Sequence, residues 1–242
     1  MGETTHKLAI GYPHPGMVHQ GFMDSYVKFR EFDLTHGNIL GAVIPQQGMY
    51  IAGQRNRIVR NFLNTKLEWL LCMDADHTYA PELPYLLIQS AEDNDARIMS
   101  ALYFGILAGE PSPMWWQRTP KGEFATTGEI VEGVQEIQGF GMGMVLIHRS
   151  VFEEMLPMRP DDPWKWFGHD LTEFHGSIER YGEDLCFCDR VHSLGIKMYG
   201  DSRILVGHSK TINLDFETFL KLAKHRKDGE PDAPARVIDP IV

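Results

Sequence analysis

Residues 70–79, LLCMDADHTY, run from apolar side chains directly into two aspartates that are separated by a single alanine. The apolar part belongs to residues 67–73, LEWLLCM, and such a near-continuous run is typical of a strand buried on both faces of a parallel sheet. Residues i and i+2 of an extended chain point the same way, so Asp74 and Asp76 can converge. Because two carboxylates this close repel each other, the stretch predicts a buried strand that ends beside a positive partner.

The surrounding sequence alternates between further strands and helices. Three other segments are expected to be strands, 7–12, 38–45 and 96–104. Apolar residues at helical spacing predict a helix over residues 50–64, and a second helix is expected over 80–94, with Pro81 near its first turn. This alternation indicates an α/β protein with a mostly parallel central sheet flanked by helices.

The second half of the chain is less regular. The expected elements are, in order, irregular strands and loops over 111–141, a strand and a short helix over 142–155, a long functional loop over 161–182, a helix over 183–195, one or two strands over 196–208 and a last helix over 214–227. Gly195 is suited to close its helix, and Asp215 is the expected N-cap of the last one. We expect a single domain over residues 1–228 and a loosely held tail over 229–242.

Composition narrows the class of protein. The chain has 242 residues, of which 43% are hydrophobic, and a formal net charge of −10, which makes non-specific nucleic-acid binding a poor expectation. An apolar run of about 18 residues is absent, so no membrane span is expected, and the N-terminus lacks the basic start of a signal peptide. Cys72, Cys186 and Cys188 are expected to be buried or half-buried free thiols in a reducing cytoplasm, not zinc ligands.

The aspartate pair suggests a specific chemistry. Ligands bind open α/β sheets at the carboxyl ends of strands, and converging carboxylates there suit Mg²⁺ or Mn²⁺ that also holds substrate phosphates. The competing interpretation is that one aspartate caps the next helix and the other is a solvated turn residue. Arg55 falls on the apolar face of its helix with Ile58 and Phe62, so it needs an anionic partner, either a phosphate or one of the aspartates, unless it extends to water.

Two later motifs add candidates. YGEDLCFCDR places Glu183 and Asp184 in the first turn of a helix, where the helix dipole stabilises acidic residues and where a general base can face a pocket. VGHSK places His208 after a strand, where a neutral imidazole serves either as a third metal ligand or as a hydrogen-bonded structural residue. The residue types alone leave both alternatives open.

Taken in order, these motifs resemble a GT-A type glycosyltransferase, close to the family-2-like enzymes and especially the small members found in phage genomes. The resemblance covers about residues 7–210 and rests on the order of LAIGYP, AGQRNRIVRNFL, LEWLLCMDADHTYAPEL, IMSALYF, GFGMGMVLIHRSVFEEM, WF at 166–167, GEDLCFCDRVHSLGIKMY and VGHSK. It implies a GT-A (Rossmann-like) fold, with a nucleotide-sugar half over about 1–110 and an irregular acceptor half over about 111–228.

The resemblance also implies roles for individual residues. The implied donor-binding residues are Tyr12, Pro13, Arg55, Asp74 and Asp76. The implied ligands of a divalent metal, Mn²⁺ or Mg²⁺, are Asp74, Asp76 and His208. The implied catalytic base is Asp184, and the implied acceptor-side residues are Trp166, Phe167, Gly141 and Glu183. His77 departs from the pattern, since family-2 enzymes often carry another aspartate there; it is either a metal neighbour or without a role.

The activity implied by the resemblance is metal-dependent transfer of a hexose from a nucleoside-diphosphate sugar, with a UDP-sugar favoured, to an acceptor hydroxyl. Inverting stereochemistry is favoured. The acceptor stays open among a surface glycan or other polysaccharide, a lipid-linked sugar, a protein and a hydroxymethylated DNA base. The phage-like resemblance favours DNA, whereas the acidic charge disfavours it. The expected location is the cytoplasm, which is the host cytoplasm for a phage enzyme.

Three other functions compete with this one. A nucleotidyltransferase would share the metal–diphosphate chemistry, but it usually has a glycine-rich loop with lysine or arginine after its first strand, and GYPHPGMVHQG contains neither. DADHT also fits the Asp-x-Asp-x-Thr motif of haloacid-dehalogenase-like phosphatases, in which Asp74 would be the nucleophile and Asp76 the acid/base. That motif normally follows the first strand, whereas here it follows the third expected strand. A catalytically inactive sugar-binding module is the third alternative, and it would need neither a metal-binding pair nor a base.

Overall fold

The structure is a computed structural model that describes residues 6–156, 165–168 and 181–211, together with residues 215, 216, 218 and 220. The chain divides into two compact units, Met1–Ser209 and Lys210–Val242. The expected last helix lies largely outside the described residues, but the Thr218 N–H donates to Asp215 Oδ1 at 2.8 Å, which is the hydrogen bond expected of an N-cap. The helices and strands named below all belong to the first unit.

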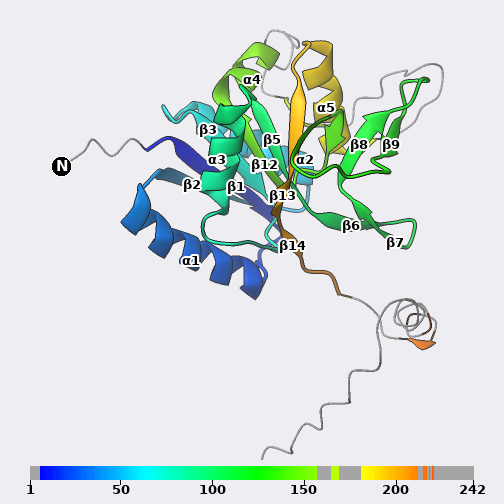
Figure 1. Ribbon diagram of the computed structural model, residues 1–242. Coiled ribbons are helices and arrows are strands. Elements are labelled where there is room, and N and C mark those ends of the chain that lie inside the picture. The colour runs from blue at the N-terminus through cyan, green and yellow to red at the C-terminus, as the bar shows by residue number, and fades with distance from the viewer. Residues whose placement is uncertain are drawn as a thin grey trace, which may run out of the picture. The chain divides into compact units, whose positions relative to one another are not determined.

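A seven-stranded sheet forms the centre of the first unit (Figure 1). Its strands in spatial order are β10 (Val134–Ile137), β13 (Met198–Leu205), β5 (Ile98–Leu102), β12 (Met144–His148), β3 (Trp69–Met73), β1 (Leu8–His14) and β2 (Leu40–Gln47). Strands β1, β2 and β3 run parallel, as do β5 and β13. Strand β12 lies antiparallel between β3 and β5, and β10 pairs antiparallel with β13.

All five residues of β3 are buried, which explains its apolar sequence. Successive side chains of a strand point to opposite faces of the sheet. Leu70 and Cys72 therefore pack into one hydrophobic core, and Trp69, Leu71 and Met73 into the other. The strand that the sequence predicts is confirmed, and it brings the two aspartates to the edge of the sheet.

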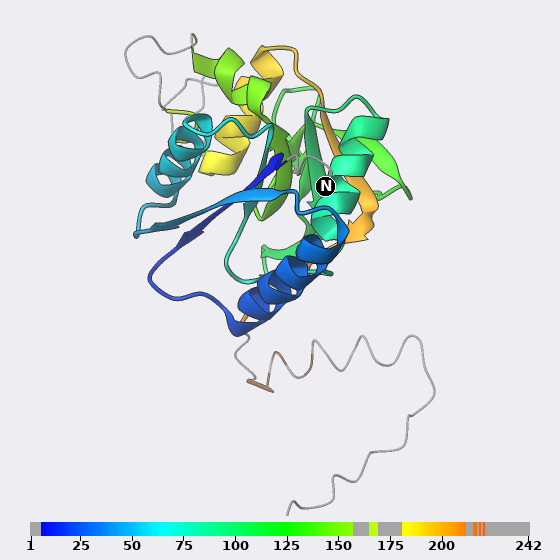
Figure 2. The ribbon, with the colours of Figure 1, turned by 90° about the vertical axis from the view of Figure 1, so that its left-hand side faces the viewer.

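Helices cover both faces of this sheet, as Figure 2 shows for α2 and α3. The helices that pack on one face are α2 (Ile51–Leu63), α4 (Arg149–Met155) and α5 (Glu183–Ser193). Those on the other face are α1 (Gln20–His36) and α3 (Leu83–Asp93). The expected α/β architecture, a central sheet flanked by helices, is confirmed.

The sequence does not predict α1, and it misplaces the start of α3. In α1, Phe22 and Phe29 are buried, but Val27 and Leu34 are exposed, so the apolar residues do not form the single stripe by which a helix is recognised. Helix α3 begins at Leu83, so Pro84 occupies its first turn where Pro81 was expected.

Short strands make up much of the second half of the chain. One small sheet pairs β6 (Phe104–Leu107) with β7 (Glu110–Pro113), and another contains β8 (Trp115–Arg118), β9 (Phe124–Thr126) and β11 (Gly139–Phe140). A third pairs β4 (His77–Thr78) with β14 (Gly207–His208). The irregular second half is therefore confirmed for the described residues, whereas only 165–168 and 181–182 of the expected loop over 161–182 are described.

Two expectations from composition can be compared with the structure. The three cysteines are free, with Cys72 and Cys188 buried and Cys186 half-buried, as predicted. Within the part of the chain that the structure describes, no helix has the length and apolar character needed to cross a membrane.

Candidate active site

The candidate active site lies at the carboxyl end of β3. Asp74 directly follows this strand, and its backbone N–H donates to the Gly143 carbonyl oxygen at 2.9 Å. Two residues later, the Asp76 carbonyl oxygen accepts from the Ser209 N–H at 2.9 Å. Backbone hydrogen bonds therefore fix two segments that are distant in the sequence against the Asp-x-Asp stretch.

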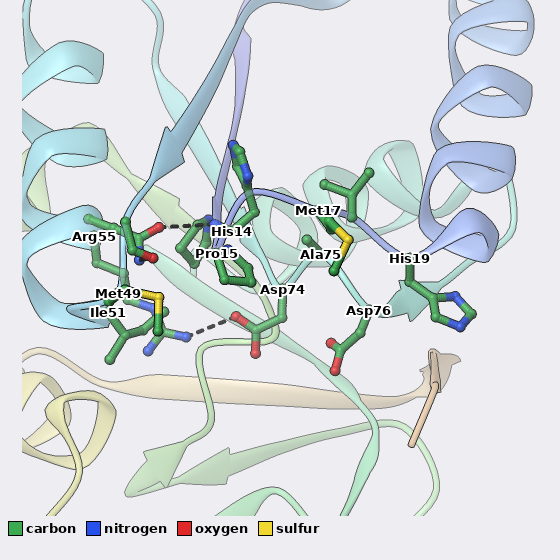
Figure 3. Close-up of a pocket in the computed structure, with 14 residues that line it drawn as sticks. His14, Pro15, Met17, His19, Met49, Ile51, Arg55, Asp74, Ala75 and Asp76 are labelled. Carbon is green, nitrogen blue, oxygen red and sulfur yellow. Dashed lines mark hydrogen bonds and ion pairs between the residues drawn. The ribbon is translucent and has the colours of Figure 1, made fainter. Parts of the chain in front are cut away.

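Arg55 supplies the positive charge that the aspartate pair requires. It is only 7% exposed, because it lies on the buried face of α2. Its Nη2 donates to Asp74 Oδ1 at 2.9 Å, and its Nη1 donates to Glu183 Oε1 (the Asp74 contact is dashed in Figure 3). The expectation that Arg55 pairs with one of the aspartates is confirmed, and the alternative that it extends to water is wrong. Because the guanidinium is buried, removing its carboxylate partners would leave a charge that little water can stabilise.

Asp76 belongs to a separate group with His77 and His208. Strands β4 and β14 are antiparallel, and their register places His77 opposite His208. The two rings stack with centroids 4.3 Å apart and planes 15° apart. Ligand atoms from the three residues all lie within 4.8 Å of one another, as a metal site requires. Asp74, which we expected to share the metal with Asp76 and His208, is not part of this group, and its Oδ1 pairs with Arg55. His77, for which the sequence left the role open, completes the group.

The orientation of His208 suits metal binding. Its Nδ1 lies 2.9 Å from the Phe104 carbonyl oxygen, and because a carbonyl can only accept, Nδ1 carries a proton. Nε2 is then the nitrogen directed at Asp76, and it lies 3.3 Å from Asp76 Oδ2. A hydrogen bond from the second ring nitrogen to a backbone carbonyl is the usual way in which proteins orient a metal-binding histidine.

His77 is a fully buried, neutral imidazole. Burial lowers its pKa to about 4, although the nearby charge of Asp74 acts in the opposite direction. Its Nδ1 lies 3.5 Å from Asp76 Oδ1, but neither ring nitrogen has a hydrogen-bond partner among the described residues. Buried polar atoms without a partner are rare and costly. The donor set of one carboxylate and two imidazoles, with these two unsatisfied nitrogens, therefore fits a divalent metal ion.

An open pocket with a volume of about 670 Å³ adjoins the aspartates (Figure 3). The side chains of Asp74 and Asp76 point in the same direction at its edge. The lining residues come from the end of β1 and the segment after it, from the segment between β2 and α2, from the start of α2, and from the Asp-x-Asp stretch: Pro13, His14, Pro15, Met17, Val18, His19, Gly48, Met49, Ile51, Gln54, Arg55, Asp74, Ala75 and Asp76. Pro13 lines this pocket, whereas the neighbouring Tyr12 ring packs against Phe22 with centroids 4.9 Å apart.

Gln54 joins the two walls of this pocket. Its Nε2 donates to the Gly48 carbonyl oxygen at 2.9 Å, and its Oε1 accepts from the His14 N–H at 2.9 Å. The sequence interpretation missed Gln54, but a signal was present. A glutamine one position before Arg55 and four before Ile58 lies toward the buried face of the helix, where an amide must find partners.

Asp184 lies in the first turn of α5, as predicted, with a half-buried side chain. Its Oδ1 accepts from the Leu185 N–H at 2.8 Å. Burial raises the pKa of Asp184 above its ordinary value, although the positive charge of Arg55 acts in the opposite direction. We expected the helix dipole to favour the charged form, whereas the pKa of Asp184 is raised, with burial as the largest cause. A raised pKa makes the ionised carboxylate a stronger base.

Three of the four expected acceptor-side residues, Trp166, Phe167 and Gly141, do not line an open surface. Trp166 and Phe167 are buried, and Phe167 stacks on Phe187 of α5 with centroids 4.7 Å apart. Asn56 Oδ1 accepts from the N–H groups of both residues, at 2.9 and 2.8 Å. Gly141 is buried as well. These positions support the neighbouring helix and strands, and the expectation that they touch an acceptor does not fit the structure.

Comparisons with known proteins identify the fold. A scan of protein-family models and a search of curated proteins returned no match to this sequence. Among solved structures, A197 from STIV matches with a TM-score of 0.58 and 18% identity, over 85% of this chain and 86% of that chain. GalNAc-T7 with UDP, GalNAc and Mn²⁺ matches with a TM-score of 0.55 and 12% identity, over 87% of this chain and 45% of that chain. The chain thus spans a little under half of GalNAc-T7, and it has a GT-A-like fold.

The raised pKa of Asp184 predicts a pH-dependent stability. A carboxyl group whose folded pKa lies above its unfolded value loses its contribution to stability as the pH rises through that interval. Asp184→Asn removes the buried charge, so its melting temperature should exceed that of the wild type at pH 7–8, and the difference should shrink toward pH 4. Asp24→Asn, on the exposed side of α1, controls for the loss of one surface charge. If the melting-temperature difference between Asp184→Asn and wild type does not change with pH, the raised pKa of Asp184 is wrong.

Proposed function

We propose that this protein is a metal-dependent glycosyltransferase that uses a nucleoside-diphosphate sugar as its donor. The observation that carries the proposal is the convergence of Asp76, His77 and His208 at a pocket that Asp74, Asp76 and Arg55 help to line. A pocket that ends in a cation site suits a ligand that carries a diphosphate. Its volume of about 670 Å³ is within the range of small-molecule sites.

The fold supports the same proposal. GalNAc-T7, whose structure contains UDP, GalNAc and Mn²⁺, shares the GT-A-like fold. At 12% identity this likeness concerns the fold alone, so the argument for function depends on the residues of this chain. We favour a UDP-sugar because UDP is the nucleotide in that complex.

We propose Asp76, His77 and His208 as the residues that hold the metal, and Mn²⁺ as the ion. Imidazole nitrogens suit transition ions better than Mg²⁺, which prefers oxygen ligands. When bound, such an ion stabilises the negative charge on the leaving nucleoside diphosphate. Asp74, held by Arg55, is then a donor-binding residue, whose position suits a hydrogen bond to the sugar or ribose.

Asp184 is our proposed general base. It lies beside the Arg55 network, and a base with a raised pKa accepts a proton from a sugar hydroxyl more readily than an ordinary aspartate does. Glu183 takes part indirectly, because its ion pair with Arg55 fixes the start of α5 and hence Asp184. A base at this position favours an inverting reaction.

The acceptor is the least constrained part of the proposal. A surface glycan and a hydroxymethylated DNA base both fit a transferase of the phage type, and the net charge of −10 weighs against DNA. The proposed location is the host cytoplasm. We also propose that the chain divides into a nucleotide-sugar half, about residues 1–110, and an acceptor half, about residues 111–228.

Two alternatives remain open to test. A phosphatase would use Asp74 as its nucleophile, but Arg55 engages that carboxylate at 2.9 Å, which opposes nucleophilic attack. An inactive sugar-binding module would bind the nucleotide-sugar without cleaving it. Release of nucleoside diphosphate separates both from a transferase, since a phosphatase releases inorganic phosphate and a binding module releases nothing.

The first prediction for function concerns turnover. In a screen of UDP-, GDP- and TDP-hexoses, at least one donor should release nucleoside diphosphate with Mn²⁺, and Asp76→Asn should abolish the release while the circular dichroism spectrum stays native. Full turnover in excess chelator would contradict the proposal, as would unchanged activity in Asp76→Asn.

The second prediction concerns the metal alone. His208→Ala removes one nitrogen ligand, so Mn²⁺ should bind about tenfold or more weakly in a calorimetric titration without donor, and wild type should prefer Mn²⁺ to Mg²⁺. His192→Ala, on the exposed side of α5, is the matched control and should bind Mn²⁺ as wild type does. Equal affinities for His208→Ala and wild type would return His208 to a structural role.

The third prediction concerns the base. Asp184→Asn keeps the shape and the hydrogen bond from the Leu185 N–H but removes basicity. It should lower kcat by roughly 10²–10⁴ and leave the dissociation constant of the donor nearly unchanged. Loss of donor affinity with an unaltered kcat would identify Asp184 as a donor contact.

A further inference from the structure

Tyr103 contacts both imidazoles of the proposed metal site. It follows β5 directly and is almost fully buried. Its ring lies nearly perpendicular to His77, with centroids 4.7 Å apart and planes 85° apart, and to His208, at 5.5 Å and 80°. Because neither nitrogen of His77 has a hydrogen-bond partner among the described residues, packing against Tyr103 and His208 is what holds its ring.

Two glycines leave room for this arrangement. A Cβ atom at Gly141 would lie 2.2 Å from Tyr103 Oη. A Cβ atom at Gly143 would lie 2.5 Å from His77 Cε1 and 2.7 Å from Tyr103 Cζ. Real Cβ atoms do not approach other heavy atoms within 3.0 Å, so any side chain at either position would displace the tyrosine or the histidine.

Backbone conformation does not explain these glycines. The described glycines with positive φ do not include Gly141 or Gly143, so other residues could adopt their backbone angles. Hydrogen bonds also connect this segment to the site: the Gly143 N–H donates to Tyr103 Oη at 3.1 Å, and the Gly143 carbonyl oxygen accepts from the Asp74 N–H at 2.9 Å. The requirement at both positions is therefore space for Tyr103 and His77.

We propose that Tyr103, seated against Gly141 and Gly143, is the positioning residue of the metal site. Its ring sets the orientation of His77 and His208, and the two glycines set the position of that ring. The inference rests on the proposed metal-dependent function and extends it to residues that do not themselves bind the ion. It also gives Gly141 a physical role in place of the acceptor contact that the resemblance implies.

The test uses Mn²⁺ as the probe and binding as the readout, measured by calorimetry on the full chain without donor. Gly141→Ala should weaken Mn²⁺ binding about tenfold or more, because the new methyl group displaces the tyrosine hydroxyl. Adding Tyr103→Phe should restore affinity to within about threefold, because the clashing oxygen is gone and the next nearest atom, Tyr103 Cζ, lies at 3.3 Å. Gly128→Ala is the matched control, since a Cβ there meets nothing within 4 Å.

Tyr103→Leu provides a second variant if Gly141→Ala does not fold. It removes the ring and should also weaken Mn²⁺ binding about tenfold or more, whereas Tyr103→Phe alone keeps the ring and should bind within about threefold of wild type. In the metal-free protein, the NMR signals of the His77 and His208 rings should shift in Gly141→Ala and return in the double variant.

The outcomes separate this inference from the proposed function. If wild type binds Mn²⁺ and His208→Ala does not, but Gly141→Ala and Tyr103→Leu bind normally, the metal site stands and the positioning role is wrong. If Gly141→Ala binds Mn²⁺ more weakly and adding Tyr103→Phe does not restore the affinity, the inference is also wrong. If wild type does not bind Mn²⁺ at all, the metal site and the inference both fail.

Discussion

The buried guanidinium of Arg55 is the interaction on which the rest of the site depends. It lies between Asp74 at the end of β3 and Glu183 at the start of α5, so one side chain joins the central sheet to two helices. Without it, three carboxylates including Asp184 would face one another with little water to screen them. The two aspartates have different partners: Asp74 forms an ion pair with Arg55, whereas Asp76 lies beside His77 and His208.

The second constraint is the pairing of β4 with β14. Two strands of two residues each bring His77 opposite His208, and the Phe104 carbonyl then fixes which nitrogen of His208 faces Asp76. Tyr103, the residue before Phe104, packs against both rings. The group of Asp76, His77 and His208 is therefore held by backbone pairing and close packing more than by side-chain hydrogen bonds.

The sequence predicts what local pattern determines. The apolar run before Asp74 identifies a buried strand, and Arg55 on an apolar helical face identifies a buried ion pair, and both are found. It does not predict contacts that arise only from the folded chain. Trp166, which the resemblance places on the acceptor side, is buried. The pairing of His77 with His208 depends on two strands that are too short to leave a pattern in the sequence. Helix α1 was missed because its apolar residues are not confined to one face.

Pulsed electron paramagnetic resonance of the Mn²⁺-loaded protein with UDP is the sharpest test of the proposed metal site, because it reports the nuclei around one ion. We expect couplings to two imidazole nitrogens, from His77 and His208, and a phosphorus coupling that appears when UDP is added. A nitrogen coupling that is lost in His208→Ala would be assigned to His208. An ion that shows no nitrogen coupling, or one that keeps its nitrogens but gains no phosphorus from UDP, would contradict the proposal that this group holds a nucleoside diphosphate.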